Sequence, residues 1–176
     1  MVKVDSKGLF KEIKAEELTS NAFKMFDKDW TLITAEKDSK VNTMTASWGG
    51  LGIMWNKNVA YIVIRPQRYT KEFVDASDTF SLSFFDNSYK KKLGYLGKVS
   101  GRDEDKIGKA ELTVTWDEKT PYFSEADTVL ICRKLLASPF HEEHFIDKSI
   151  IDKNYPEKDY HTLYIGEIEK VLVKEK

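Results

Sequence analysis

The residues best suited to chemistry are two arginines and two hydroxyl side chains in the segment Arg65-Pro66-Gln67-Arg68-Tyr69-Thr70. The segment joins an expected strand to an expected helix over 70–76, and Pro66 ends the strand because it has no N–H to donate. Guanidinium groups form forked, charge-assisted hydrogen bonds with anions, and the first turn of a helix offers free N–H groups. The segment therefore predicts a phosphate site; the alternative is a solvated turn with unpaired arginines.

A second candidate segment, Asn42-Thr43-Met44-Thr45-Ala46-Ser47-Trp48-Gly49-Gly50-Leu51-Gly52, combines strand-forming residues with small ones. Glycine weakens the interior of a strand because it costs backbone entropy and packs no side chain. Two interpretations stay open on this segment alone. It is either a bulged barrel corner, where glycine relieves a tight bend, or a backbone edge exposed to a planar ligand, with threonine and serine hydroxyls beside it.

The charged loop over 99–109 is a third candidate. It contains Ser100, Gly101, Arg102 and Lys106, which would bring a hydroxyl, backbone groups and positive charge to an anionic ligand. The alternative is ordinary solvated surface, with one helical turn in the loop.

Metal and nucleophile chemistry find little support. His141 and His144 are three residues apart, not four as in the helical zinc protease motif, so we expect a solvated loop and no metal site. Cys132 lies within an expected strand, which favours a buried, inert thiol. The sequence contains no Gly-x-Ser-x-Gly elbow, no Walker loop and no Gly-x-Gly-x-x-Gly, so the common nucleophile, nucleotide-hydrolysis and Rossmann signatures are missing.

The chain as a whole sets limits on the class of protein. With 176 residues it fits one domain over 1–176, with 1–19 as a polar arm on the surface. Its 28 Lys and Arg against 29 Asp and Glu leave a net charge of -1, so no overall field favours nucleic acid or a membrane. No apolar run approaches the roughly 20 residues of a membrane span. One cysteine and no signal-peptide pattern predict a cytoplasmic protein.

The elements that position these residues are mostly strands. Short turns separate the first strands, which favours an antiparallel meander, and 79–84 alternates polar and apolar residues as a half-buried strand does. Gly166, inside the last strand, indicates a bulge or a close backbone approach. We expect strands over 30–35, 42–52, 59–64, 79–84, 112–116, 126–136 and 161–173, and helices over 22–26, 70–76 and 89–96, the last with Leu93 and Leu96 facing inward. This series predicts a mainly β fold, a closed or nearly closed barrel.

The order of the segments resembles the flavin reductase-like family of FMN-binding split barrels, in particular its flavoredoxin branch. The resemblance covers roughly residues 22–172 and rests on the segments 42–48, 65–70, 100–103 and 161–167. It implies an antiparallel Greek-key split β-barrel with a few short helices, a homodimer, and FMN held near the dimer interface.

The resemblance also implies roles for individual residues. Those along the isoalloxazine would be Thr43, Met44, Thr45, Ala46, Ser47 and Trp48. Those around the ribityl phosphate would be Arg65, Arg68, Tyr69 and Thr70, with Ser100, Gly101, Arg102 and Lys106 closing over the same end. His161, from the same or the neighbouring subunit, is the one candidate for a catalytic role. The insertion over 141–159 departs from the family pattern and would reshape or cover the nicotinamide face.

The function that the resemblance implies is reduction of flavin by NADH or NADPH, with hydride transfer at N5. Such chemistry belongs to the cofactor, so the lack of an obvious catalytic dyad counts little against an enzyme. Electrons would pass to free flavin or to a redox protein. The alternatives are a flavoredoxin-like FMN electron carrier that serves a protein partner, and a flavin-free binding module on the same barrel.

Overall fold

The computed structural model describes residues 8–175 of the chain. The strands in this part are β1 (Phe10–Ile13), β2 (Thr31–Lys37), β3 (Lys40–Ala46), β4 (Gly49–Met54), β5 (Lys57–Ile64), β6 (Thr79–Phe84), β7 (Val114–Asp117), β8 (Thr120–Phe123), β9 (Thr128–Pro139) and β10 (Thr162–Lys174). The α-helices are α1 (Ala22–Lys24), α2 (Tyr69–Ala76), α3 (Lys90–Lys98), α4 (Lys106–Lys109) and α5 (Ser149–Asn154). Single turns of 3-10 helix lie at Ala15–Glu17, Asn87–Tyr89 and Glu142–His144, and a π-helical turn at Met25–Asp29 follows α1.

The main sheet is antiparallel and curls back on itself. Its strand order is β3-β2-β6-β9-β10-β5-β4, with β1 pairing on β10, while β7 and β8 form a separate hairpin. The two end strands, β3 and β4, are consecutive in the chain and are separated only by Ser47 and Trp48. The result is a barrel with a split between its end strands, which confirms the mainly β, antiparallel split barrel predicted from the sequence. Among residues 8–175, no helix is long and apolar enough to cross a membrane.

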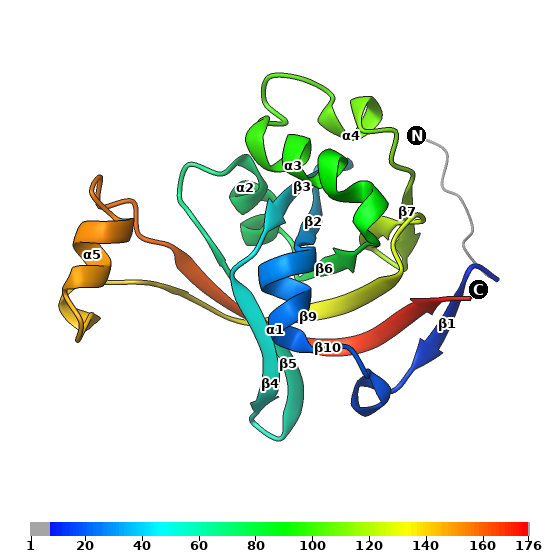
Figure 1. Ribbon diagram of the computed structural model, residues 1–176, viewed down its shortest axis with the longest axis horizontal. Helices are drawn as coiled ribbons and strands as arrows, with labels where there is room; N and C mark the ends of the chain where they lie inside the picture. Colours follow the sequence, from blue (N-terminus) through cyan, green and yellow to red (C-terminus); the bar gives the residue numbers. More distant parts are fainter. Residues whose placement is uncertain (1–7, 176) are drawn as a thin grey trace.

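The helices are distributed unevenly around this barrel. Figure 1 shows α2, α3 and α4 gathered over one end of it, whereas α5 sits on an arm that projects from the body. The arm is the connection from β9 to β10, and it contains the insertion noted in the sequence. On α3, Leu93 and Leu96 are buried on the inner face, as the sequence predicted.

The segment 42–52 is two strands, so the prediction of a single strand was wrong. β3 pairs with β2 and β4 pairs with β5, and the chain therefore passes from one end of the sheet to the other at Ser47 and Trp48. Packing explains two of the glycines. A Cβ on Gly49 would lie 2.7 Å from the Phe26 ring, and one on Gly50 would lie 2.6 Å from the Tyr61 ring.

The structure also corrects two expectations, one about the N-terminal arm and one about the burial of β6. Part of the expected N-terminal surface arm forms β1, in which Phe10 pairs with Lys174, while residues 1–7 lie outside the described part of the chain. β6 is buried along both faces, not half-buried, because the β7–β8 hairpin covers its serine side. The Ser81 hydroxyl donates to the Pro121 carbonyl at 2.6 Å, which satisfies the buried polar group.

Gly166 confirms the expected bulge and close approach. The pairing of β10 with β9 shifts register between Ile165 and Gly166. A Cβ on Gly166 would lie 2.8 Å from the tip of the buried Phe80 ring and 3.0 Å from the Cβ of Cys132. Only glycine lets β10 come this close to the core beneath it. Cys132 is fully buried there, and burial raises the pKa of its thiol, so it stays protonated and inert.

Candidate functional site

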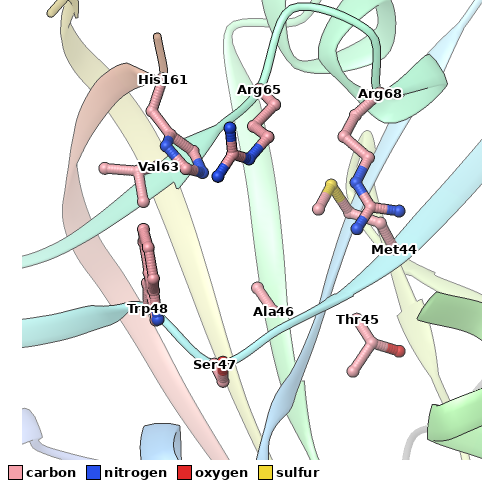
Figure 2. A pocket seen from close by; sticks show the side chains of 9 residues that line it. All are labelled: Met44, Thr45, Ala46, Ser47, Trp48, Val63, Arg65, Arg68 and His161. Carbon is pink, nitrogen blue, oxygen red and sulfur yellow. The ribbon is translucent and has the colours of Figure 1, made fainter. Parts of the chain in front are cut away.

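A cavity of about 300 Å³, called here the first cavity, lies at the split of the barrel. Figure 2 shows two arginines on one side of it, opposite the chain that crosses from β3 to β4. Its lining residues are Met44, Thr45, Ala46, Ser47, Trp48, Val63, Arg65, Arg68 and His161. The structure thus brings together segments from β3, from the end of β5 and from the start of β10, which lie far apart in the sequence.

One wall of the first cavity is a strand edge. β3 is the last strand in the sheet order, and among the described strands it pairs only with β2. Its second edge therefore carries no partner among these strands, and Ser47 and Trp48, which follow β3, belong to no strand. Backbone N–H and C=O groups at such an edge remain able to bond a planar heterocycle. This supports the interpretation of the segment as a backbone edge open to a planar ligand.

The two arginines stand at the opposite wall. β5 ends at Ile64, directly before the Arg65-Pro66 step, and a turn closed by the Arg68 N–H on the Arg65 carbonyl (3.1 Å) holds the two arginines near each other. Arg68 Nη1 donates to the Gly97 carbonyl at 2.8 Å. A guanidinium has five N–H donors, so this bond leaves others for an anion in the cavity.

Arg65 is engaged more fully than Arg68. Its Nη1 lies 2.7 Å from Asp159 Oδ2 in an ion pair, and its Nη2 donates to the Asn154 carbonyl at 2.9 Å. Its guanidinium carbon also lies 5.0 Å from the centre of the Tyr155 ring. All three partners belong to the arm between β9 and β10, which therefore fixes one of the two cations at the cavity.

His161 completes the wall next to Arg65 (Figure 2). Its ring lies 5.2 Å from the Trp48 ring, centre to centre, and its Nδ1 is 2.7 Å from the Tyr155 hydroxyl. Burial, with a further contribution from the charge of Arg65, lowers the pKa of His161 to about 4, so the ring is neutral near pH 7. A phenol is the stronger donor, so we assign the shared hydrogen to Tyr155 and the ring hydrogen of His161 to Nε2.

Seven of the residues expected at the site do not line the first cavity. They are Thr43, Tyr69, Thr70, Ser100, Gly101, Arg102 and Lys106. The buried Thr43 hydroxyl donates to the Ile33 carbonyl at 3.0 Å, inside the barrel. Thr70 lies within α2, where its hydroxyl accepts a hydrogen bond from Asn42 Nδ2 at 2.9 Å, so it does not cap the helix.

The loop after α3 turns its charges away from the cavity. Arg102 Nη1 donates to the Gln67 carbonyl at 3.2 Å, its Nη2 pairs with Glu72, and its guanidinium lies over the Tyr69 ring. Gly101 is held against Asn42, since a Cβ there would lie 2.2 Å from Asn42 Oδ1. This loop therefore packs on the start of α2, and its basic groups are used within the protein.

Val63 and the residues behind Arg65 and His161 were missed from the sequence. Val63 lies on the outward face of β5, and the alternation along 59–64 could have placed it there. Asn154, Tyr155 and Asp159 fall in the insertion that the sequence marked as a departure from the family. Nothing in their local pattern indicates that they hold Arg65 and His161, because that contact depends on how the arm folds back.

A second, more apolar cavity adjoins the first. It measures about 890 Å³ and shares Ser47, Trp48 and Val63 with the first cavity. Its other apolar lining residues come from the first helical segment, β5 and the arm: Phe23, Phe26, Tyr61, Phe140, Phe145, Ile150 and Tyr155. Asn21, Lys24, Asp27, Lys28 and Gly49 complete the lining. Trp48 stands between the two cavities and is 49% exposed, so an apolar surface opens beside the first cavity.

Fold and site together define a flavin reductase-like barrel, with a cavity lined by two arginines at its split. The family model described as Flavin reductase like domain matches residues 24–176, and the chain belongs to this family. No curated protein matches the chain.

Solved structures share the fold at low sequence identity. An FMN-binding domain of a flavin reductases-like enzyme from Shewanella baltica OS155 aligns with a TM-score of 0.68 at 14% identity, covering 94% of this chain and 77% of the other. Flavoredoxin from Methanosarcina acetivorans aligns with a TM-score of 0.67 at 24% identity, covering 94% and 76%. An FMN-binding protein from Thermus thermophilus aligns with a TM-score of 0.65 at 20% identity, covering 92% and 79%.

Proposed function

We propose that the chain binds FMN in the first cavity and is a reductase that transfers a hydride from NADH or NADPH to flavin. The observation that carries this proposal is the pairing of an open strand edge at β3 with the guanidinium groups of Arg65 and Arg68 across one cavity. A flavin phosphate needs a cationic cradle, and an isoalloxazine needs a flat wall with polar backbone groups at its edge. The residues present fit both needs.

The chain's own residues would hold and shield the ligand. Arg68, with donors left beyond its bond to Gly97, would bind the phosphate, and Arg65 would add charge that Asp159 partly neutralises. Backbone groups along 45–47 would bond the polar edge of the ring system. Trp48 and His161 would exclude water from one side of it. When bound, FMN supplies the hydride chemistry, and no protein side chain has to act as acid or base for it.

A visible absorption spectrum of the freshly purified protein, followed by titration with FMN, tests the cofactor. Binding at about micromolar affinity or better supports the proposal; a colourless protein that ignores added FMN would sink it and leave a flavin-free binding module. Adding NADH or NADPH with excess free flavin then tests turnover. Steady bleaching of the free flavin marks a reductase, and the faster nucleotide identifies the donor.

The flavoredoxin-like electron carrier is the second candidate. It is favoured by the similarity to flavoredoxins from Methanosarcina acetivorans, at 24% identity, and Desulfovibrio vulgaris (Miyazaki F), at 23%. A carrier retains its FMN and exchanges electrons with a protein partner. Protein that holds FMN tightly, fails to turn over free flavin with either nucleotide, and is reduced by an added redox protein would fit this function.

A homodimer belongs to the same proposal. Large apolar side chains are exposed on α1 and at the β4–β5 hairpin, including Phe23 at 87%, Ile53 at 71% and Trp55 at 53%. Contiguous exposed apolar surface marks interaction sites, and we propose that these side chains belong to the dimer interface. Light scattering on a sizing column tests the dimer: we expect a dimer, and Phe23→Asp should shift the protein toward monomer.

We further propose that the chain is a single domain and that it works in the reducing cytoplasm. Its one buried cysteine is consistent with that compartment.

A further inference from the structure

Lys106 is a buried cation that does not line the first cavity. It is the first residue of α4, and only 4% of its surface is exposed. Its Nζ donates to the carbonyls of Leu96 and Val99, at 2.9 Å each. A buried ammonium is costly unless it is hydrogen-bonded. The acceptors are carbonyls at the C-terminal end of α3, where helix carbonyls lack partners and the helix dipole favours a cation.

The same turn of α3 holds Arg68. Between the two acceptors of Lys106 lies Gly97, whose carbonyl accepts the 2.8 Å bond from Arg68 Nη1. Lys106 and Arg68 therefore both donate hydrogen bonds to carbonyls of one short stretch of backbone, 96–99. They are near enough that Arg68, after the larger effect of burial, helps to lower the pKa of Lys106 to about 8. Of these two cations, Arg68 is the one that lines the first cavity.

The other side of α3 is fixed as well. The Thr45 hydroxyl donates to the Leu93 carbonyl at 2.6 Å, and a Cβ on Gly97 would lie 3.2 Å from the Thr45 Cβ. α3 thus rests on β3, the strand whose open edge forms one wall of the cavity. Contacts with β3 and with Lys106 thus fix the position of the Gly97 carbonyl. That carbonyl in turn orients Arg68 through the hydrogen bond that it accepts.

We propose that Lys106 is a positioning residue for the phosphate of FMN: it secures the C-terminal turn of α3, and the Gly97 carbonyl in that turn aims Arg68 into the first cavity. Lys106 itself does not touch the ligand. This inference rests on the proposed function, because it requires FMN in that cavity. It differs from the role implied by sequence resemblance, in which Lys106 closes over the phosphate directly.

The test compares FMN with riboflavin, which lacks the phosphate, by titration against the full-length protein. Lys106→Met removes the ammonium and keeps the volume and flexibility of the side chain. We expect it to weaken FMN binding about tenfold, the scale of one charge-assisted hydrogen bond, and to change riboflavin binding less than twofold. Lys109→Met, on the exposed side of the same helix, is the matched control and should change neither affinity.

A double-mutant cycle separates the indirect role from direct contact. Contributions that act through one group are not additive, so Lys106→Met should add less than twofold to the loss caused by Arg68→Ala. A further tenfold loss in the Arg68→Ala background would show direct contact with the phosphate and overturn the proposal. Equal losses for FMN and riboflavin would also overturn it, since they indicate a general effect on the fold.

A second variant keeps the test informative if Lys106→Met fails to fold. Lys106→Gln keeps N–H donors for the carbonyls of α3 without the charge, and it should recover at least part of the preference for FMN over riboflavin. If neither variant folds, Lys106 serves the fold alone and the proposal is overturned. If the unmodified protein binds neither ligand, the proposed function itself has failed, whereas binding of both ligands with unchanged preference in Lys106→Met rejects only the role of Lys106.

Discussion

The guanidinium of Arg65 and the carboxylate of Asp159 lie 2.7 Å apart, so the end of β5 is tied to the end of the arm between β9 and β10. Gln67 donates to the same carboxylate oxygen at 2.8 Å, and these two bonds hold the pKa of Asp159 below its usual range. Asp159 is therefore ionised at neutral pH, and it offsets positive charge at the first cavity. The arm between β9 and β10 thus contributes a negative charge to the site.

Asp159→Asn should tighten FMN binding. The substitution removes the negative charge that competes with the phosphate for Arg65, while an amide oxygen can still accept a hydrogen bond from Gln67. Because the pair is partly exposed, we expect a gain of about 0.5 to 1 kcal/mol, or two- to fivefold in Kd at low salt. Fluorescence titration at low and high salt measures it. Riboflavin is the control ligand; an equal gain for riboflavin would mean that charge is not the cause.

Arg68→Ala should weaken FMN binding by about 1 to 3 kcal/mol, the cost of losing a charge-assisted hydrogen bond to the phosphate. Arg65→Ala should act in the same direction within the same range. Arg102→Ala is the matched control, since its guanidinium is turned onto Glu72 and Gln67, away from the cavity. Isothermal titration of the three variants decides the matter. Unchanged affinity in both Arg65→Ala and Arg68→Ala would place the phosphate site elsewhere.

The contrast between Arg68 and Arg102 shows that the direction of a charged side chain could not be predicted from the sequence. The strands, the helix after Pro66 and the pair of arginines could be predicted, because periodicity and local chemistry determine them. Which way a charged side chain points depends on contacts with distant segments. Arg68 meets the C-terminal turn of α3, while Arg102 meets the first turn of α2. In the sequence, both arginines were candidates for the phosphate site.

The break at Ser47 and Trp48 has a similar explanation. Residues 42–52 have the composition of one strand, but strands are assigned by their partners. β3 pairs with β2 just before it, whereas β4 pairs with β5 just after it, at the other end of the sheet. The switch that opens the barrel at the first cavity is therefore a property of pairing between strands and has no local signal beyond the glycines.

Gly101→Ala should destabilise the fold without entering the cavity. The added methyl would lie 2.2 Å from Asn42 Oδ1 and would push aside the side chain that bonds Thr70. We expect the free energy of unfolding to fall by about 1 to 3 kcal/mol, the range for a strained site and a lost buried hydrogen bond. Gly94→Ala, in α3 with open space around it, should instead raise it by about 0.5 to 1 kcal/mol. Urea unfolding compares them; equal effects would contradict the packing.

His161 makes stability depend on pH in a direction fixed by its pKa. In the folded protein that pKa is about 4, chiefly because the ring is buried, with Arg65 adding repulsion. In the unfolded chain it returns to about 6.5. The unfolded state therefore binds a proton first as the pH falls. The stabilisation is complete above about pH 6.5 and is lost progressively toward pH 4.

The free energy of unfolding should accordingly fall between pH 7 and pH 4 by roughly 3 kcal/mol more in the unmodified protein than in His161→Gln. The glutamine keeps a partner for the Tyr155 hydroxyl and removes the titrating ring. Urea unfolding at intervals of half a pH unit measures the difference. His144→Gln, on the exposed arm, controls for general loss of a histidine and should keep the full pH dependence. Parallel curves for the unmodified protein and His161→Gln would mean that the ring takes up its proton in the folded state as readily as in the unfolded one, and that the wall beside Arg65 is open to water.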